Sequence, residues 1–140
     1  MATTILRTPE ETIAFGRALA GTLHSGDVIA LCGELGAGKT HLVKGLAAGL
    51  GAECPVTSPT FTLIHEYPGG RLPIFHADIY RVEEEQDLMK IGLDDYLAEN
   101  GIVVVEWADK FPKSLPARTR WIKFQFLEDG TREVSEDDRA

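Results

Sequence analysis

One eight-residue segment, residues 33–40, constrains the fold of this chain more than any other part of the sequence. It reads Gly-Glu-Leu-Gly-Ala-Gly-Lys-Thr and satisfies the pattern G-x-x-x-x-G-K-[S/T]. A wholly apolar run at 28–32 precedes it, and apolar residues at helical spacing follow it until Gly51. Glycines let the backbone close around a phosphate, so that N–H groups and a helix N-terminus point at the anion. The segment therefore predicts a P-loop between a buried strand and a helix.

The last two residues of this loop carry its chemistry. Lys39 is expected to reach the β and γ phosphates of a nucleotide, and the Thr40 hydroxyl to bind Mg²⁺. The sequence contains no N-K-x-D guanine reader and no D-x-x-G in its second half, so ATP is a better ligand than GTP. We expect ATP and Mg²⁺ as cofactors and no other metal.

A second wholly apolar run, residues 102–105, ends on Glu106 and Trp107. A carboxylate at the end of a strand beside the P-loop could hold the magnesium shell or align the attacking water. Glu106 is the favoured residue over an ordinary exposed glutamate because four apolar residues precede it. Asp78 also ends a predicted strand, where it could activate water or bind Mg²⁺, but capping a turn is an equally good interpretation.

Other candidates carry weaker signals. Ser58 and Thr60 lie in a polar loop, where P-loop proteins can place a segment that senses the γ phosphate. Trp107 puts an aromatic ring beside the nucleotide region or fills the core. The four histidines have no metal-ligand spacing, so we interpret each as a surface or packing residue.

The rest of the chain predicts an α/β fold: a three-layer P-loop NTPase with a mixed central sheet and β-hairpins. We expect one domain over residues 1–140, with an acidic tail at 135–140 that frays. Helices are expected at 9–24, 39–50 and 83–97. Strands are expected at 28–32, 61–67, 72–78, 102–105, 121–127 and 132–135.

Composition limits the partners. A net charge of -8 opposes direct electrostatic binding to nucleic acid or to an anionic membrane, so any RNA would be held by a partner. The two cysteines form no C-x-x-C, and no apolar segment is long enough to cross a bilayer. These features predict a cytoplasmic protein with reduced thiols.

Three functional classes remain at this point. A GTPase switch lacks its guanine-reading parts. A small-molecule kinase usually needs an arginine-rich lid, and the eight arginines of this chain are scattered. A small ATPase that drives or times a partner's reaction fits best, with the kinase or a stand-alone nucleotide-binding switch as the alternatives.

Four motifs together resemble the TsaE (YjeE) family in content, order and spacing. They are residues 33–40, Thr-Ser-Pro-Thr-Phe-Thr at 57–62, His-Ala-Asp-Ile-Tyr-Arg at 76–81 and Val-Glu-Trp at 105–107. The resemblance runs from about residue 8 to residue 132, and it departs at His41, where the family often has a second threonine. It implies a bacterial ATPase required for N6-threonylcarbamoyladenosine in tRNAs that read codons beginning with A. Its implied partners are TsaB and TsaD, which contact the tRNA, and its ATPase is implied to be weak alone and stronger with them.

The resemblance also implies roles for individual residues. Lys39 would bind the phosphates, Thr40 and Glu106 would bind Mg²⁺, and Asp78 would assist hydrolysis. Ser58 and Thr60 would form the nucleotide-sensing loop, and Trp107 would flank the site. The implied ATP-binding residues are Gly33, Glu34, Leu35, Gly36, Ala37, Gly38, Lys39 and Thr40, with base contacts from Pro9, Asp109 and Arg132.

Overall fold

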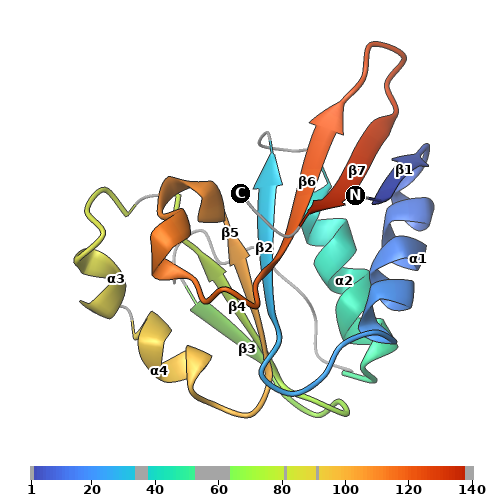
Figure 1. Ribbon diagram of the computed structural model, residues 1–140. Coiled ribbons are helices and arrows are strands. Elements are labelled where there is room, and N and C mark those ends of the chain that lie inside the picture. Colours follow the sequence, from blue (N-terminus) through green and yellow to red (C-terminus); the bar gives the residue numbers. More distant parts are fainter. Residues whose placement is uncertain (1, 34–37, 53–63, 81, 91, 138–140) are drawn as a thin grey trace.

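The computed structural model describes residues 2–33, 38–52, 64–80, 82–90 and 92–137. Within these ranges, seven strands form one mixed sheet in the order β1-β7-β6-β2-β5-β4-β3 (Figure 1). The strands are β1 (Ala2–Leu6), β2 (Val28–Gly33), β3 (Ile64–Tyr67), β4 (Ile74–Asp78), β5 (Ile102–Glu106), β6 (Arg120–Phe126) and β7 (Arg132–Asp137). Strands β4, β5, β2 and β6 are parallel neighbours, while β3, β7 and β1 pair antiparallel at the two sides. The expected mixed sheet with β-hairpins is confirmed.

Helices cover both faces of the sheet, so the expected three layers are present (Figure 1). Helices α1 (Pro9–Ala20) and α2 (Lys39–Gly49) cover one face. The other face carries α3 (Asp87–Lys90), α4 (Leu93–Leu97) and two 3₁₀ helices, η1 (Ala108–Lys110) and η2 (Pro112–Ser114). No helix in the described ranges combines the length and apolar character that crossing a lipid bilayer requires.

Strands β2 and β5 consist almost entirely of apolar residues, as expected for strands that are buried on both faces. Successive side chains of β2 point to opposite faces, so Leu31 packs under α1 and α2 while Ala30 packs on the other side. Strand β5 is likewise buried along its whole length. A strand with one face in solvent alternates apolar and polar residues, but these strands have helices on both faces and so contain a continuous apolar run.

Helix α1 begins at Pro9, as the sequence predicts. The Thr8 side chain caps it by accepting a hydrogen bond from the Glu11 N–H at 3.1 Å. The helix ends at Ala20, four residues before the predicted end. Arg71, from the loop between β3 and β4, donates to the Ala20 carbonyl at 3.0 Å and so satisfies a free carbonyl at the helix end.

The predicted single helix over 83–97 is wrong in extent. The structure has two short helices instead, α3 and α4, and Gly92 lies between them with φ of +81°. This left-handed conformation caps the N-terminus of α4 and is accessible to glycine at little cost. The helical spacing correctly indicates the apolar residues Leu88 and Leu93, which pack on the sheet. It does not indicate the turn at Gly92, which divides the segment into two helices.

Both chain ends contain more strand than the sequence indicates. Strand β1 has no sequence-based counterpart, and it pairs with β7. The expected frayed tail at 135–140 is wrong for its first part, because β7 continues to Asp137 and pairs with β6. The carboxylate of Glu136 receives two hydrogen bonds from Arg120, at 2.7 and 2.9 Å. This bidentate ion pair and the strand pairing hold an acidic segment that composition alone assigns to solvent.

Glycines allow α1 and α2 to pack in direct backbone contact. The two helices run in the same direction, with Gly16 against Leu42, Gly45 against Ile13 and Gly49 against Ala20. A Cβ atom on Gly45 would overlap the carbonyl oxygen of Ile13 and lie 3.0 Å from the Arg17 nitrogen. The parallel packing brings the N-termini of both helices to the same end of the sheet (Figure 1).

We predict that Gly45→Ala destabilises the protein, although alanine favours a helix over glycine by up to about 1 kcal/mol. Backbone carbonyls cannot move aside easily, and overpacking of this kind costs about 1–3 kcal/mol. Urea unfolding should therefore show a lower midpoint for this variant. Gly21→Ala is the matched control, since its nearest new contact is the Ala18 oxygen at 3.4 Å and its φ of -66° suits alanine. Equal stability of the Gly45→Ala variant and the parent would contradict the packing argument.

Candidate active site

The candidate site lies where three parallel strands end side by side. Glu106, the last residue of β5, pairs in register with Leu31 of β2 on one side and with Asp78 of β4 on the other. Helix α2 begins at the same edge, with Lys39 as its first residue. Ligands of α/β sheets bind at this carboxyl edge, next to helix N-termini.

The glycines that frame the loop have the geometry for which they were predicted. Gly33 has φ of +136°, and a Cβ there would lie 2.5 Å from the carbonyl oxygen of Phe124. Gly38 has φ of +102° and is the N-cap of α2. Four other loop residues, Glu34, Leu35, Gly36 and Ala37, lie outside the described residues.

Lys39 is a charged side chain that is only 5% exposed. Its ammonium donates to the Gly33 carbonyl at 3.2 Å and lies 4.1 Å from the centroid of the Trp107 ring. Burial lowers the pKa of Lys39, and the negative charges of Glu106 and Asp78 oppose this effect. A single oxygen and an aromatic face are weak partners for a buried ammonium, so it can still gain by binding an anion.

Glu106 is also buried, and a histidine binds its carboxylate. Oε2 of Glu106 lies 2.6 Å from Nε2 of His76, on the neighbouring strand β4. The other ring nitrogen of His76, Nδ1, lies 3.1 Å from the hydroxyl of Tyr67 on β3. The interpretation of His76 as a surface or packing residue is therefore incomplete: it is buried, but it also hydrogen bonds to the candidate metal ligand.

Asp78 caps a turn, which is one of the two interpretations that the sequence offers, and it also lies beside the other candidate residues of the site. Its Oδ1 accepts the N–H of Tyr80 at 2.9 Å, which caps the turn after β4. It is also buried beside Glu106 and within electrostatic reach of Lys39. Burial raises the pKa of Asp78, the hydrogen bond from Tyr80 lowers it, and repulsion from Glu106 raises it further.

Trp107 lies on the rim of the site in an unusual backbone conformation. Its φ of +62° makes it the one non-glycine residue with positive φ in the described ranges. The Trp107 ring packs on the Tyr80 ring with 4.8 Å between their centroids. The backbone N–H of Trp107 donates to the Leu31 carbonyl at 3.0 Å. A bulky residue in this region is strained, and such strain clusters at functional sites. The left-handed turn places the indole ring against Lys39.

The three expected base contacts occupy different places around the loop. Arg132, at the start of β7, lies next to Gly38, because a Cβ on Gly38 would be 3.3 Å from its Nε. Asp109, in η1, lies beside Cys32 on the opposite face of the sheet, and Pro9 begins α1. The structure thus brings Arg132 to the phosphate loop itself.

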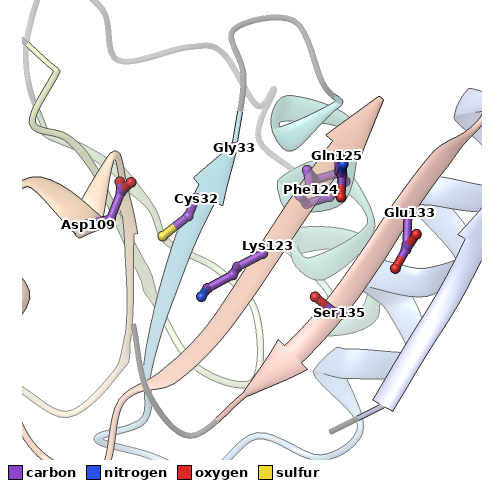
Figure 2. Close-up of a pocket in the computed structure, with 8 residues that line it drawn as sticks. All are labelled: Cys32, Gly33, Asp109, Lys123, Phe124, Gln125, Glu133 and Ser135. Carbon is purple, nitrogen blue, oxygen red and sulfur yellow. The ribbon is translucent and has the colours of Figure 1, made fainter. Parts of the chain in front are cut away.

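Asp109 and the end of β2 border a pocket of about 520 Å³ on the face that α1 and α2 leave open (Figure 2). Figure 2 shows Cys32 and Asp109 at one side of it and the polar side chains of β6 and β7 along the other. Burial raises the pKa of the Cys32 thiol to about 11, and the nearby Asp109 charge adds to this. Cys32 is therefore a buried thiol whose ionisation is unfavourable. The lining residues are Cys32, Gly33, Asp109, Lys123, Phe124, Gln125, Glu133 and Ser135.

Sequence reasoning missed His76 and Tyr67, and Ser58 and Thr60 lie outside the described residues. A signal for His76 exists: it stands two residues before Asp78, so both side chains face the same side of β4. A polar residue at an inward position of a strand requires a hydrogen-bond partner. The sequence alone does not identify that partner, because it lies on β5.

The donor atoms at this edge suit Mg²⁺. Hard oxygen ligands bind Mg²⁺, which is usually held by one or two protein groups together with phosphate oxygens and water. Thr40, in the first turn of α2, offers a hydroxyl, and Glu106 offers a carboxylate of which Oε2 contacts His76. These oxygens fit a magnesium ion carried in with a nucleotide.

We predict that Asp78→Asn stabilises the protein at neutral pH, measured by urea unfolding without nucleotide or magnesium. Because the pKa of Asp78 is raised in the folded state, ionised Asp78 destabilises the fold above that pKa. This cost disappears as the pH falls through the folded pKa toward the ordinary value of 3.8. The difference in unfolding free energy between Asp78→Asn and the parent should therefore shrink on acidification. Asparagine keeps the side-chain oxygen that accepts from the Tyr80 N–H, so the substitution leaves the turn cap in place.

Asp129→Asn is the control, with the opposite sign expected. Hydrogen bonds from Thr131 lower the pKa of Asp129, so its charge stabilises the folded state at neutral pH. An Asp78→Asn variant that is less stable than the parent at neutral pH would show that Asp78 is primarily a structural cap.

Comparison with known proteins identifies the family. Residues 6–134 match the family model described as "Threonylcarbamoyl adenosine biosynthesis protein TsaE". The chain is 44% identical to a Bacillus subtilis tRNA threonylcarbamoyladenosine biosynthesis protein TsaE, over 91% of this chain and 79% of that protein. It is 40% identical to the Treponema pallidum protein of the same name, over 94% and 96% of the two chains. A crystal structure of Bacillus subtilis YdiB superposes with a TM-score of 0.79 at 38% identity, covering 95% of this chain and 82% of that one. The chain belongs to the TsaE family of tRNA threonylcarbamoyladenosine biosynthesis proteins.

Proposed function

We propose that this TsaE family member is a magnesium-dependent ATPase that supports threonylcarbamoyladenosine formation on tRNA. The observation that carries the proposal is one buried ammonium, Lys39, at the first turn of α2 beside two buried carboxylates, Glu106 and Asp78. A helix N-terminus and a lysine bind phosphate, and the carboxylates serve a metal ion and a water molecule. Binding and hydrolysis of ATP require each of these groups.

Charge balance explains why the nucleotide would enter together with a cation. Glu106 and Asp78 already interact unfavourably with each other across neighbouring strands. A triphosphate at the start of α2 would add more negative charge to the same buried region, where interactions are poorly screened. Thr40 and Glu106 would hold a magnesium ion, which would supply the compensating charge.

Asp78 is the residue we assign to the attacking water. Hydrolysis adds water to the γ phosphorus and breaks its bond to the bridging oxygen, which leaves ADP and inorganic phosphate. An ionised Asp78 would accept a hydrogen bond from that water and orient it, as positioned carboxylates do in phosphoryl transfer. The backbone bond from Tyr80 at 2.9 Å fixes the carboxylate in place.

Trp107 and Arg132 would complete the site. The indole ring covers the ammonium of Lys39 at 4.1 Å and limits access of water to it. Arg132 lies beside Gly38, and its buried Nε has no hydrogen-bond partner among the described residues, so a nucleotide oxygen or ring nitrogen could supply one. Asp109 and Pro9 are proposed base contacts, and Ser58 and Thr60 are proposed to sense the γ phosphate.

We further propose that the ATPase works with TsaB and TsaD in the cytoplasm, and that these partners bind the tRNA. The net charge of -8 supports this division of roles, because an acidic protein is repelled by a phosphate backbone. Weak hydrolysis by the chain alone, stimulated by the partners, is the expected behaviour.

We predict that Lys39→Ala reduces ATP hydrolysis by at least about 100-fold, the usual effect of removing one group that stabilises developing charge. The measurement is phosphate release in the presence of TsaB and TsaD. Lys44→Ala is the matched control, because Lys44 lies on the same helix with an exposed side chain and should keep full activity. Hydrolysis that survives in the Lys39→Ala variant would contradict the assigned site.

The role in tRNA modification has a separate test. Purified TsaB, TsaD and tRNA should form the modified base through many cycles only when this chain and ATP are added. The Lys39→Ala and Asp78→Ala variants should not support these repeated cycles when they are added in place of the parent chain. Modification that continues through many cycles without the chain would overturn the role, and transfer of phosphate to a small acceptor would favour the kinase alternative.

A further inference from the structure

A line of hydrogen bonds crosses three neighbouring strands and ends on Glu106. The Tyr67 hydroxyl on β3 lies 3.1 Å from Nδ1 of His76 on β4, and Nε2 of His76 lies 2.6 Å from Oε2 of Glu106 on β5. All three side chains are buried, and His76 is fully inaccessible to solvent. They share the face covered by α2, next to the edge where that helix begins (Figure 1).

The chemistry of the groups fixes the direction of the bond to Glu106. An ionised carboxylate can only accept, so His76 donates from Nε2 to Glu106. On the other side of the ring the Tyr67 hydroxyl can act in either sense: it donates to the lone pair on Nδ1 of a neutral imidazole and accepts from the N–H of an imidazolium. In both forms the proton on Nε2 is directed at Glu106, and the bond to Tyr67 holds the ring in this orientation.

This line explains why Glu106 and Lys39 remain apart although their charges attract. Each lies within electrostatic reach of the other in a buried region. Nevertheless Lys39 donates to the Gly33 carbonyl and lies over Trp107, while the carboxylate of Glu106 is bound by His76. A direct ion pair would occupy the two groups that nucleotide and magnesium need.

We propose that His76, supported by Tyr67, is a positioning residue that holds the Glu106 carboxylate away from Lys39 and keeps it available to magnesium. The role rests on the proposed function, because it concerns the magnesium site of that ATPase. Groups that hold a metal ligand by hydrogen bonds orient it, and their loss typically weakens metal binding by about 10–100-fold. Tyr67 holds the imidazole ring at Nδ1, and His76 sets the position of the carboxylate.

The first experiment tests the hydrogen bonds without magnesium or nucleotide. Nitrogen-15 NMR of histidine-labelled protein should show that Nε2 of His76 carries a proton. Tyr67→Phe should shift the Nδ1 resonance and leave Nε2 protonated. An unprotonated Nε2 in the unmodified protein would overturn the proposed line.

The second experiment measures magnesium affinity through ADP binding, by calorimetry with and without Mg²⁺. His76→Leu should weaken the magnesium-dependent part of binding about tenfold or more. Binding without Mg²⁺ should change little. In His76→Gln the amide nitrogen can take the place of Nε2 and donate to Glu106, so this variant should recover most of the affinity. His24→Gln is the matched control, since His24 is exposed at the opposite end of β2.

Each remaining outcome has a distinct meaning. An equal loss in His76→Leu with and without Mg²⁺ indicates a general folding role and overturns the positioning role. Unchanged magnesium affinity in His76→Leu overturns it too, as does failure of His76→Gln to recover affinity when its urea midpoint matches the parent. If the unmodified protein binds ADP without any effect of Mg²⁺, the proposed function fails as well. If Mg²⁺ strengthens ADP binding to the parent as expected, an unexpected result in the His76 variants contradicts only the positioning role and not the proposed function.

Discussion

The register between β5 and its two neighbours is the constraint on which the site depends. Glu106 lies beside Leu31 and Asp78 only because β5 pairs with β2 and β4 in this alignment. A slip of one residue would turn Glu106 to the other face of the sheet, away from α2. The apolar run of β5 cannot fix this register by itself, since both of its faces are buried.

Close packing at the opposite end of β5 supplies the missing information. A Cβ on Gly101 would lie 2.8 Å from both the Pro73 carbonyl oxygen and the Phe75 ring, so only glycine fits between these groups. The Gly101 carbonyl also accepts from the Gly26 N–H at 2.9 Å, and the Ile102 N–H donates to the Pro73 carbonyl at 2.9 Å. The register is thus set at the start of the strand, and it fixes the position of Glu106 at the candidate site five residues later.

The sequence predicts those parts of the site whose signal is local. Gly33 and Gly38 both have positive φ, which glycine adopts at little cost, and four apolar residues before Glu106 mark the end of a buried strand. The role of His76 could not be found in this way, because it depends on which strand lies next to β4. The continuation of β7 to Asp137 was missed for the same reason, since Arg120 on another strand balances the acidic residue Glu136. The role of His76 and the extent of β7 both depend on contacts between strands that are distant in the sequence, which a local sequence pattern does not reveal.

Burial of the charged groups at the candidate site also bears on the two ligands proposed for it. Burial lowers the pKa of Lys39 and raises that of Asp78, so both charged forms are unfavourable in the folded protein. A bound phosphate would stabilise the charged form of Lys39 but oppose ionisation of Asp78. A cation bound at Glu106 would favour the ionised form of Asp78. Each of the two proposed ligands would therefore relieve a charge that the other leaves unbalanced, so the proposed function implies that their binding is coupled. His76 contributes to that coupling by preventing Lys39 and Glu106 from neutralising each other in the absence of both ligands.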